Sequence, residues 1–159
     1  MNRLTKTLAL AAAVLAGAFG ATAAQASAAN FQVDFAVKNN DASYSMIRIT
    51  SPLPNGVSGL IDPASAIATG ASDPSSGNAT YSLGLPALNG FSQTTLVYGK
   101  AADSTQQCTF TMKVSHDLNT QPYLLHFTTS DSTRCPVPGD ARSSDGQFTA
   151  QTYLLNWSS

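Results

Sequence analysis

The amino-acid sequence predicts an all-β protein: an antiparallel sandwich of two sheets with about seven strands, Greek-key connections and one disulfide. Three observations support this fold class. Short segments in which apolar and polar residues alternate recur along the chain, separated by Pro, Gly and Asn. Every acidic residue is Asp, which favours turns and caps over helix interiors. The connections are too short for helical crossovers, although a closed barrel would show the same pattern and stays open as an alternative.

The first strand is expected at residues 31–37. Phe31, Val33, Phe35 and Val37 share one face of this segment, and polar or small residues occupy the other. Such alternation is typical of a half-buried strand.

A second strand is expected at 44–50, and it ends at the turn sequence 51–56, which contains two prolines and Asn-Gly. Residues 57–79 are predicted to be mainly a long loop. Residues 62–64, Asp-Pro-Ala, suit the start of a single helical turn, because Asp is a good cap and Pro is tolerated at the first helical position.

Five further strands are predicted in the rest of the chain. Both faces of residues 123–129 are partly apolar, which indicates a central strand. The apolar face of the last segment changes near Thr152, which predicts a bulge. The five segments are 81–85, 94–100, 107–115, 123–129 and 146–157.

Residues 1–28 have the pattern of a cleaved export signal. A basic start at Arg3 and Lys6 precedes an apolar stretch, and small residues allow cleavage after Ala26 or Ala28. The apolar stretch is shorter than the ~20 residues that span a bilayer. We therefore expect one domain, residues 29–159, in the periplasm or outside a bacterial cell, without a membrane span.

The two cysteines, Cys108 and Cys135, are expected to form a disulfide, because an oxidising compartment favours the bond. The closed loop has 28 residues when both cysteines are counted. The chain-entropy model gives about 3.6 kcal/mol of stabilisation for such a loop. The spacing is neither that of a redox C-x-x-C pair nor that of a zinc site.

The charge balance argues against nucleic acid as a partner. Without Arg3 and Lys6 the chain has six basic and nine acidic residues, a net charge of −3. The remaining arginines are scattered, so no basic patch for phosphate is expected.

The sequence supports a hydrolase or a calcium-binding site less well than it supports a noncatalytic function. A small hydrolase would use His116 and Asp117 with a serine, but no G-x-S-x-G elbow occurs and His-Asp at a strand end is common in turns. Asp131, Asp140 and Asp145 are possible calcium ligands, but the spacing of a calcium loop is missing. We therefore expect no cofactor and no metal, and we prefer a noncatalytic role while an enzyme stays open as an alternative.

Aromatic residues are the candidates for contact with a partner. Tyr44, Tyr98 and Trp157 would serve as platforms for a glycan or a protein if they are exposed; packing in the core is the alternative. The preferred function is an exported, noncatalytic β-sandwich module that acts by surface contact with a protein or glycan.

The chain also resembles bacterial fimbrial subunits of the chaperone and usher type. The resemblance covers the export signal, the alternating strand directly after it, the near absence of Glu, and the alternating end at 146–157. It implies a structural subunit that assembles by strand donation, with Phe31, Val33, Phe35 and Val37 on the donor strand. The two terminal segments are in either case expected as edge strands, through which self-association would occur. The cysteine pair departs from the family, because it lies late in the chain.

Overall fold

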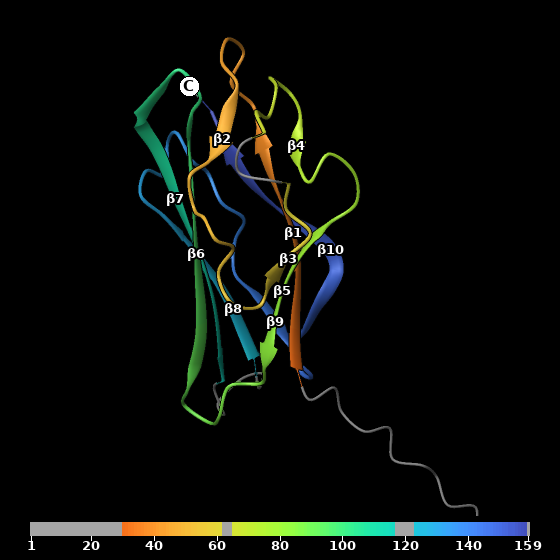
Figure 1. Ribbon diagram of the computed structural model, residues 1–159. Coiled ribbons are helices and arrows are strands. Elements are labelled where there is room, and N and C mark those ends of the chain that lie inside the picture. The colour runs from red at the N-terminus through yellow and green to blue at the C-terminus, as the bar shows by residue number, and fades with distance from the viewer. Residues whose placement is uncertain (1–29, 62–64, 117–122, 159) are drawn as a thin grey trace, which may run out of the picture.

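The computed structural model describes residues 30–61, 65–116 and 123–158, and within these ranges it has ten strands and no helix. The export signal at 1–28 and the predicted helical turn at 62–64 lie outside them. Figure 1 shows the strands, most of the long ones running along one axis of the molecule. The strands are β1 (Asn30–Asn39), β2 (Met46–Arg48), β3 (Val57–Ser58), β4 (Ser72–Asp73), β5 (Ala79–Gly84), β6 (Phe91–Lys100), β7 (Asp103–His116), β8 (Tyr123–Thr129), β9 (Ala141–Ser143) and β10 (Gln147–Trp157).

The strands form two sheets, as predicted. One sheet has the order β10-β1-β5-β3, with β4 also paired to β1, and the other has the order β2-β6-β7-β8-β9. All pairs are antiparallel except β1 with β10. In the second sheet β6 to β9 follow one another as a meander, so the expected Greek-key connections do not occur within it. The chain instead passes between the sheets after β1, β2, β5 and β9.

The seven predicted strands correspond to β1, β2, β5, β6, β7, β8 and β10. The segment at 123–129 is central, because β8 lies between β7 and β9. Three further strands, β3, β4 and β9, were not predicted. Each has only two or three residues, too few to show a period of two.

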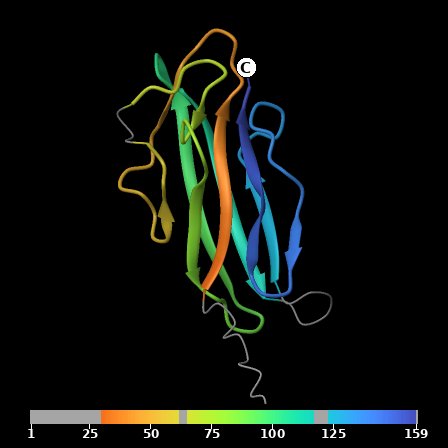
Figure 2. The ribbon, with the colours of Figure 1, turned by 90° about the vertical axis from the view of Figure 1, so that its right-hand side faces the viewer.

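The first strand is interior, so its prediction as an edge strand is wrong. It pairs with β5 on one side and with β10 on the other; Figure 2 shows β10 beside β1 and pointing the same way. Of the two terminal segments expected at sheet edges, only β10 lies at one. The reason is that a strand shows the same alternation of apolar and polar residues at the edge of a sheet and in its interior. The pattern therefore does not tell how many neighbours a strand has.

The bulge predicted near Thr152 is confirmed. Between two paired positions β1 advances from Val33 to Phe35, while β10 advances from Phe148 to Tyr153. The odd step on β10 keeps both Phe148 and Tyr153 buried, because the extra residues absorb the change of face.

The core lies between the sheets and is formed by the inward positions of both. Phe31, Val33, Phe35 and Val37 on β1 are fully buried, and β6, β7 and β8 contribute the facing layer. The largest buried side chains outside β1 include Trp157, Tyr81, Tyr98, Phe110, Met46, Leu96, Met112, Leu125 and Leu155.

The disulfide between Cys108 and Cys135 is present and fully buried. Cys108 lies within β7 rather than at its start, because this strand begins four residues before the predicted boundary. Cys135 belongs to the loop that follows β8. The bond therefore connects a central strand of the second sheet to a loop.

Candidate binding face

Of the three aromatic candidates, only Tyr44 exposes its ring. Its side chain is 45% exposed, whereas Tyr98 is fully buried and Trp157 is 2% exposed. Core packing is therefore the role of Tyr98 and Trp157. Their alternation in sequence suits an inward as well as an outward face, so sequence alone does not separate the two.

Tyr98 is part of a buried polar network between the sheets. Its hydroxyl donates to Asp73 Oδ2 at 2.7 Å, and the backbone N–H of Ile61 donates to Asp73 Oδ1 at 2.7 Å. The Arg48 guanidinium donates to the carbonyl oxygens of Thr50 and Ile61, each at 2.6 Å.

Burial raises the pKa of Asp73, and the hydrogen bonds from Ile61 and Tyr98 and the charge of Arg48 oppose this rise. Burial and the neighbouring Asp73 charge raise the pKa of Tyr98. No pocket opens onto these groups in the described part of the chain. The network holds the loop before β4 against the second sheet, and its groups face one another rather than a cleft.

The two histidines lie apart, and each has its own partner. His116 Nδ1 donates to the carbonyl oxygen of Pro86 at 3.1 Å, and its ring stacks on Tyr123 with 4.6 Å between ring centroids. His126 Nδ1 lies 2.6 Å from Asp140 Oδ1 on the surface. Asp117, the proposed partner of His116, lies outside the described residues.

The three aspartates considered as calcium ligands engage different groups. Asp131 accepts from the backbone N–H groups of Thr133 and Arg134, Asp140 pairs with His126, and Asp145 accepts from Ser143. Residues 30–61, 65–116 and 123–158 contain no group of three or more His, Cys, Asp or Glu side chains placed to hold a metal ion.

The outer face of the second sheet presents an ordered set of polar side chains to solvent. The inward residues of β7 are buried, so the alternate residues point outward. Thr95 on β6 pairs with Thr111 on β7, which pairs with Thr128 on β8. The hydroxyls of Thr95 and Thr111 are 3.2 Å apart. A row of hydroxyl groups therefore crosses three strands.

Exposed apolar side chains gather at the two ends of β6. Phe91, at its start, is 60% exposed, and Leu88 in the preceding turn is 47% exposed. At the other end Ile49 is 37% exposed and lies over Gly99, where a Cβ atom would come within 2.5 Å of Ile49 Cδ1. Tyr44 lies at this end too, beside Lys100. Four of the five exposed large apolar residues in the described ranges are thus associated with β6.

An aromatic ring and a lysine are paired at each end of this strand. Lys100 Nζ lies 3.0 Å from the centroid of the Tyr44 ring, and Lys113 Nζ lies 4.4 Å from that of Phe91. A strand of ten residues is roughly 30 Å long. We call the outer surface of β6, together with the two ring–lysine pairs at its ends, the β6 face. Phe91 and Lys113 have outward parity. Lys100 instead has the parity of the buried Tyr98 and pairs with the buried Met46, so the register places its pair with Tyr44 at the end of the strand and not on the outer surface of the sheet. The β6 face offers apolar and cationic contacts at both ends and hydroxyl groups between them.

Sequence reasoning identified Tyr44 but missed Phe91, Ile49 and the two lysines. A signal was present for Phe91. In β6 the buried large residues occupy even positions, Leu96 and Tyr98, so Phe91 has the parity of the solvent side. The pairing of each ring with a lysine required the register of β6 with β7 and the course of the loop before β2.

The residues proposed for a donor strand, Phe31, Val33, Phe35 and Val37, fill the core of their own chain. Donation of this strand to a neighbour would require it to leave both β5 and β10.

No protein-family model, curated protein or solved structure matches the chain. None of the described segments is a helix of the length and apolarity that a membrane crossing requires.

Proposed function

We propose that the protein is an exported, noncatalytic β-sandwich module that binds a glycan or a protein through the β6 face. The observation that carries this proposal is the pair of exposed rings, Tyr44 and Phe91, each with a lysine against it, at the two ends of one strand. Exposed apolar side chains that lie together are typical of interaction sites, and here two such groups lie at opposite ends of β6.

The chemistry of the face suits an extended, weakly acidic ligand. Aromatic rings offer stacking surfaces, and the two ammonium groups attract carboxylates. The threonine hydroxyls between them both donate and accept hydrogen bonds. The dispersed polar groups favour contact over chemistry, because an active site usually needs several ionisable groups that converge in a cleft.

Export to the periplasm or beyond is part of the same proposal. The pattern of residues 1–28 and the buried disulfide both support it, because disulfides persist in oxidising compartments.

The test is binding by the purified protein and by variants of the β6 face. Neutral and uronate-containing polysaccharides and a library of extended peptides are screened, and affinities are measured by calorimetry. We expect Phe91→Ala and Tyr44→Ala each to weaken binding about tenfold or more, as for central aromatic contacts.

Leu154→Ala is the matched control. Leu154 is 43% exposed but lies on β10 in the other sheet, so this variant should bind like the wild type. Equal binding by Phe91→Ala, Tyr44→Ala and the wild type, or a loss confined to Leu154→Ala, would place the interaction elsewhere. Selective loss of peptide or of polysaccharide binding identifies the class of partner.

A further inference from the structure

The sheet order leaves one long edge strand among those described, β10. It has eleven residues, whereas β2, β3 and β9, at the other sheet edges, have two or three. Its sequence, QFTAQTYLLNW, contains no charged residue and no proline. Charged residues and prolines are among the features with which natural proteins usually protect an edge strand from pairing with another chain.

A short segment of the loop after β8 covers the end of this edge. Asn156 N–H donates to the carbonyl oxygen of Pro136 at 3.0 Å, and Ser158 N–H donates to that of Arg134 at 2.7 Å. From the first of these hydrogen bonds to the second, the residue number rises by two on β10 and falls by two on the loop. The 134–136 segment therefore lies antiparallel along β10 and pairs with it as an added strand would.

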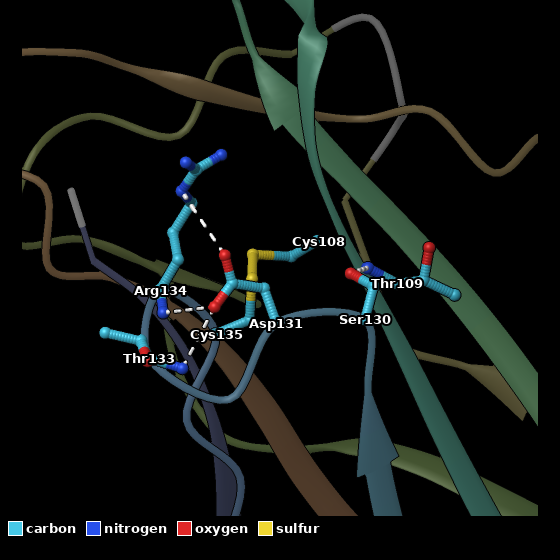
Figure 3. Close-up of a disulfide and its surroundings, with 7 residues drawn as sticks. All are labelled: Cys108, Thr109, Ser130, Asp131, Thr133, Arg134 and Cys135. Atoms are coloured by element: carbon cyan, nitrogen blue, oxygen red, sulfur yellow. Dashed lines mark hydrogen bonds and ion pairs between the residues drawn. A yellow bond between two sulfur atoms is a disulfide. The ribbon is translucent and has the colours of Figure 1, made fainter.

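The disulfide holds this segment from its centre. Cys135 lies between the two residues whose carbonyl oxygens accept from β10, and its side chain points into the core to Cys108 on the opposite sheet. Figure 3 shows the bond beside the turn in which Asp131 accepts from the N–H groups of Thr133 and Arg134. Apart from the half-buried Val137, the loop contributes few apolar side chains to the core. The covalent bond is thus the attachment of the segment to the opposite sheet, and the two backbone hydrogen bonds are its attachment to β10.

We propose that the Cys108–Cys135 disulfide keeps the chain monomeric by fixing the 134–136 segment on the edge of β10, and that without the bond this edge pairs with β10 of a second copy. A second copy fits because two identical edges can pair antiparallel about a twofold axis, and an uncharged strand does not repel itself. Leu154, 43% exposed, would lie next to its counterpart in such a pair. This inference is independent of the β6 face.

The test compares the wild type with the double variant C108A/C135A by light scattering after size exclusion, at protein concentrations from about 1 to 100 µM, because association follows mass action. The wild type should remain monomeric. The double variant should form dimers that increase with concentration, with the amides of Asn156 and Ser158 protected from exchange in the dimer.

Leu154→Lys, added to the double variant, is the control. A lysine on an edge strand opposes pairing with another chain, so the triple variant should be monomeric and as folded as the double variant. Dimers that persist in the triple variant with unprotected Asn156 and Ser158 amides would overturn the pairing through β10. A folded double variant that is monomeric at every concentration would overturn the whole proposal.

Asp131→Ala is the variant to use if the double variant does not fold. It retains the disulfide, and it removes the acceptor for two loop N–H groups and the ion-pair partner of the Arg134 side chain. The amides of Asn156 and Ser158 should then exchange about fivefold faster, the effect of roughly one lost hydrogen bond, and dimers should appear at the highest concentration. Unchanged exchange at both amides together with a monomer throughout would contradict the proposal.

Discussion

At the scale of single residues, burial decides which polar groups stabilise the fold. Asp73 is 1% exposed and is nevertheless compatible with the core, because Tyr98, Ile61 and Arg48 surround it with donors and a positive charge. A buried charge without such partners would be strongly destabilising. The same network explains why an arginine and an aspartate occur on inward positions of short strands.

Two tyrosines give a matched test of this interpretation. Tyr98→Phe should lower the free energy of unfolding by about 2 kcal/mol, because it leaves Asp73 Oδ2 without its donor inside the protein. Tyr81→Phe should not lower it and should raise it by up to about 1 kcal/mol, because it removes a hydroxyl that is buried without a hydrogen-bond partner in the described part of the chain. Urea unfolding at pH 7 measures both, and equal effects would argue against the role assigned to Asp73.

At the scale of elements, glycines set the course of the backbone where short strands attach. Gly56 has φ +80° directly before β3, and its carbonyl oxygen accepts from Ser82 N–H at 2.9 Å. A Cβ atom at this position would lie 2.6 Å from the Ser82 carbonyl oxygen. The close approach, together with the left-handed conformation, requires glycine.

Gly77 has the same left-handed backbone conformation as Gly56 but no close contact. It has φ +71°, but a Cβ atom would meet nothing within 4 Å. Gly77→Ala should therefore lower stability by only about 1 kcal/mol, the strain of the left-handed conformation. Gly56→Ala should lower it by roughly 3 kcal/mol, because strain and a backbone clash combine. Thermal unfolding compares them, and similar melting temperatures would exclude the close approach of β3 and β5.

At the scale of the whole molecule, β1 connects the two halves of its sheet. It is paired on both sides and contributes four fully buried side chains to the core. Loss of β3 or β9 would remove a strand at the edge of a sheet, whereas loss of β1 would separate β10 from β5.

Hydrogen exchange tests this arrangement. The amides of β1 should be among the slowest to exchange, because they open only with the global unfolding of the domain, and those of β3 and β9 should exchange fastest. Mass spectrometry of peptides covering residues 31–37 gives the measurement. Rapid exchange there in a folded monomer would favour strand donation, as in fimbrial subunits, over a self-contained module.

Part of this architecture was predictable from the sequence because it depends on neighbours along the chain. Alternation placed seven strands, the change of face in the last segment located the bulge of β10, and the lone pair of cysteines indicated the disulfide. The strands and the bulge follow from local geometry, because a strand has a period of two wherever one of its faces is buried. The disulfide follows instead from the expected compartment and from the presence of only two cysteines.

The order of the strands, the parallel pairing of β1 with β10 and the burial of Tyr98 and Trp157 were decided only in the tertiary structure. Alternation tells which residues share a face, but the inward and outward faces are assigned by packing against the other sheet. The β6 face and the 134–136 segment are also tertiary features, because each brings together side chains or backbone groups from distant parts of the sequence. Seven of the ten strands and their apolar faces could thus be read from neighbours along the chain, whereas long-range packing settled which surfaces and edges stay exposed.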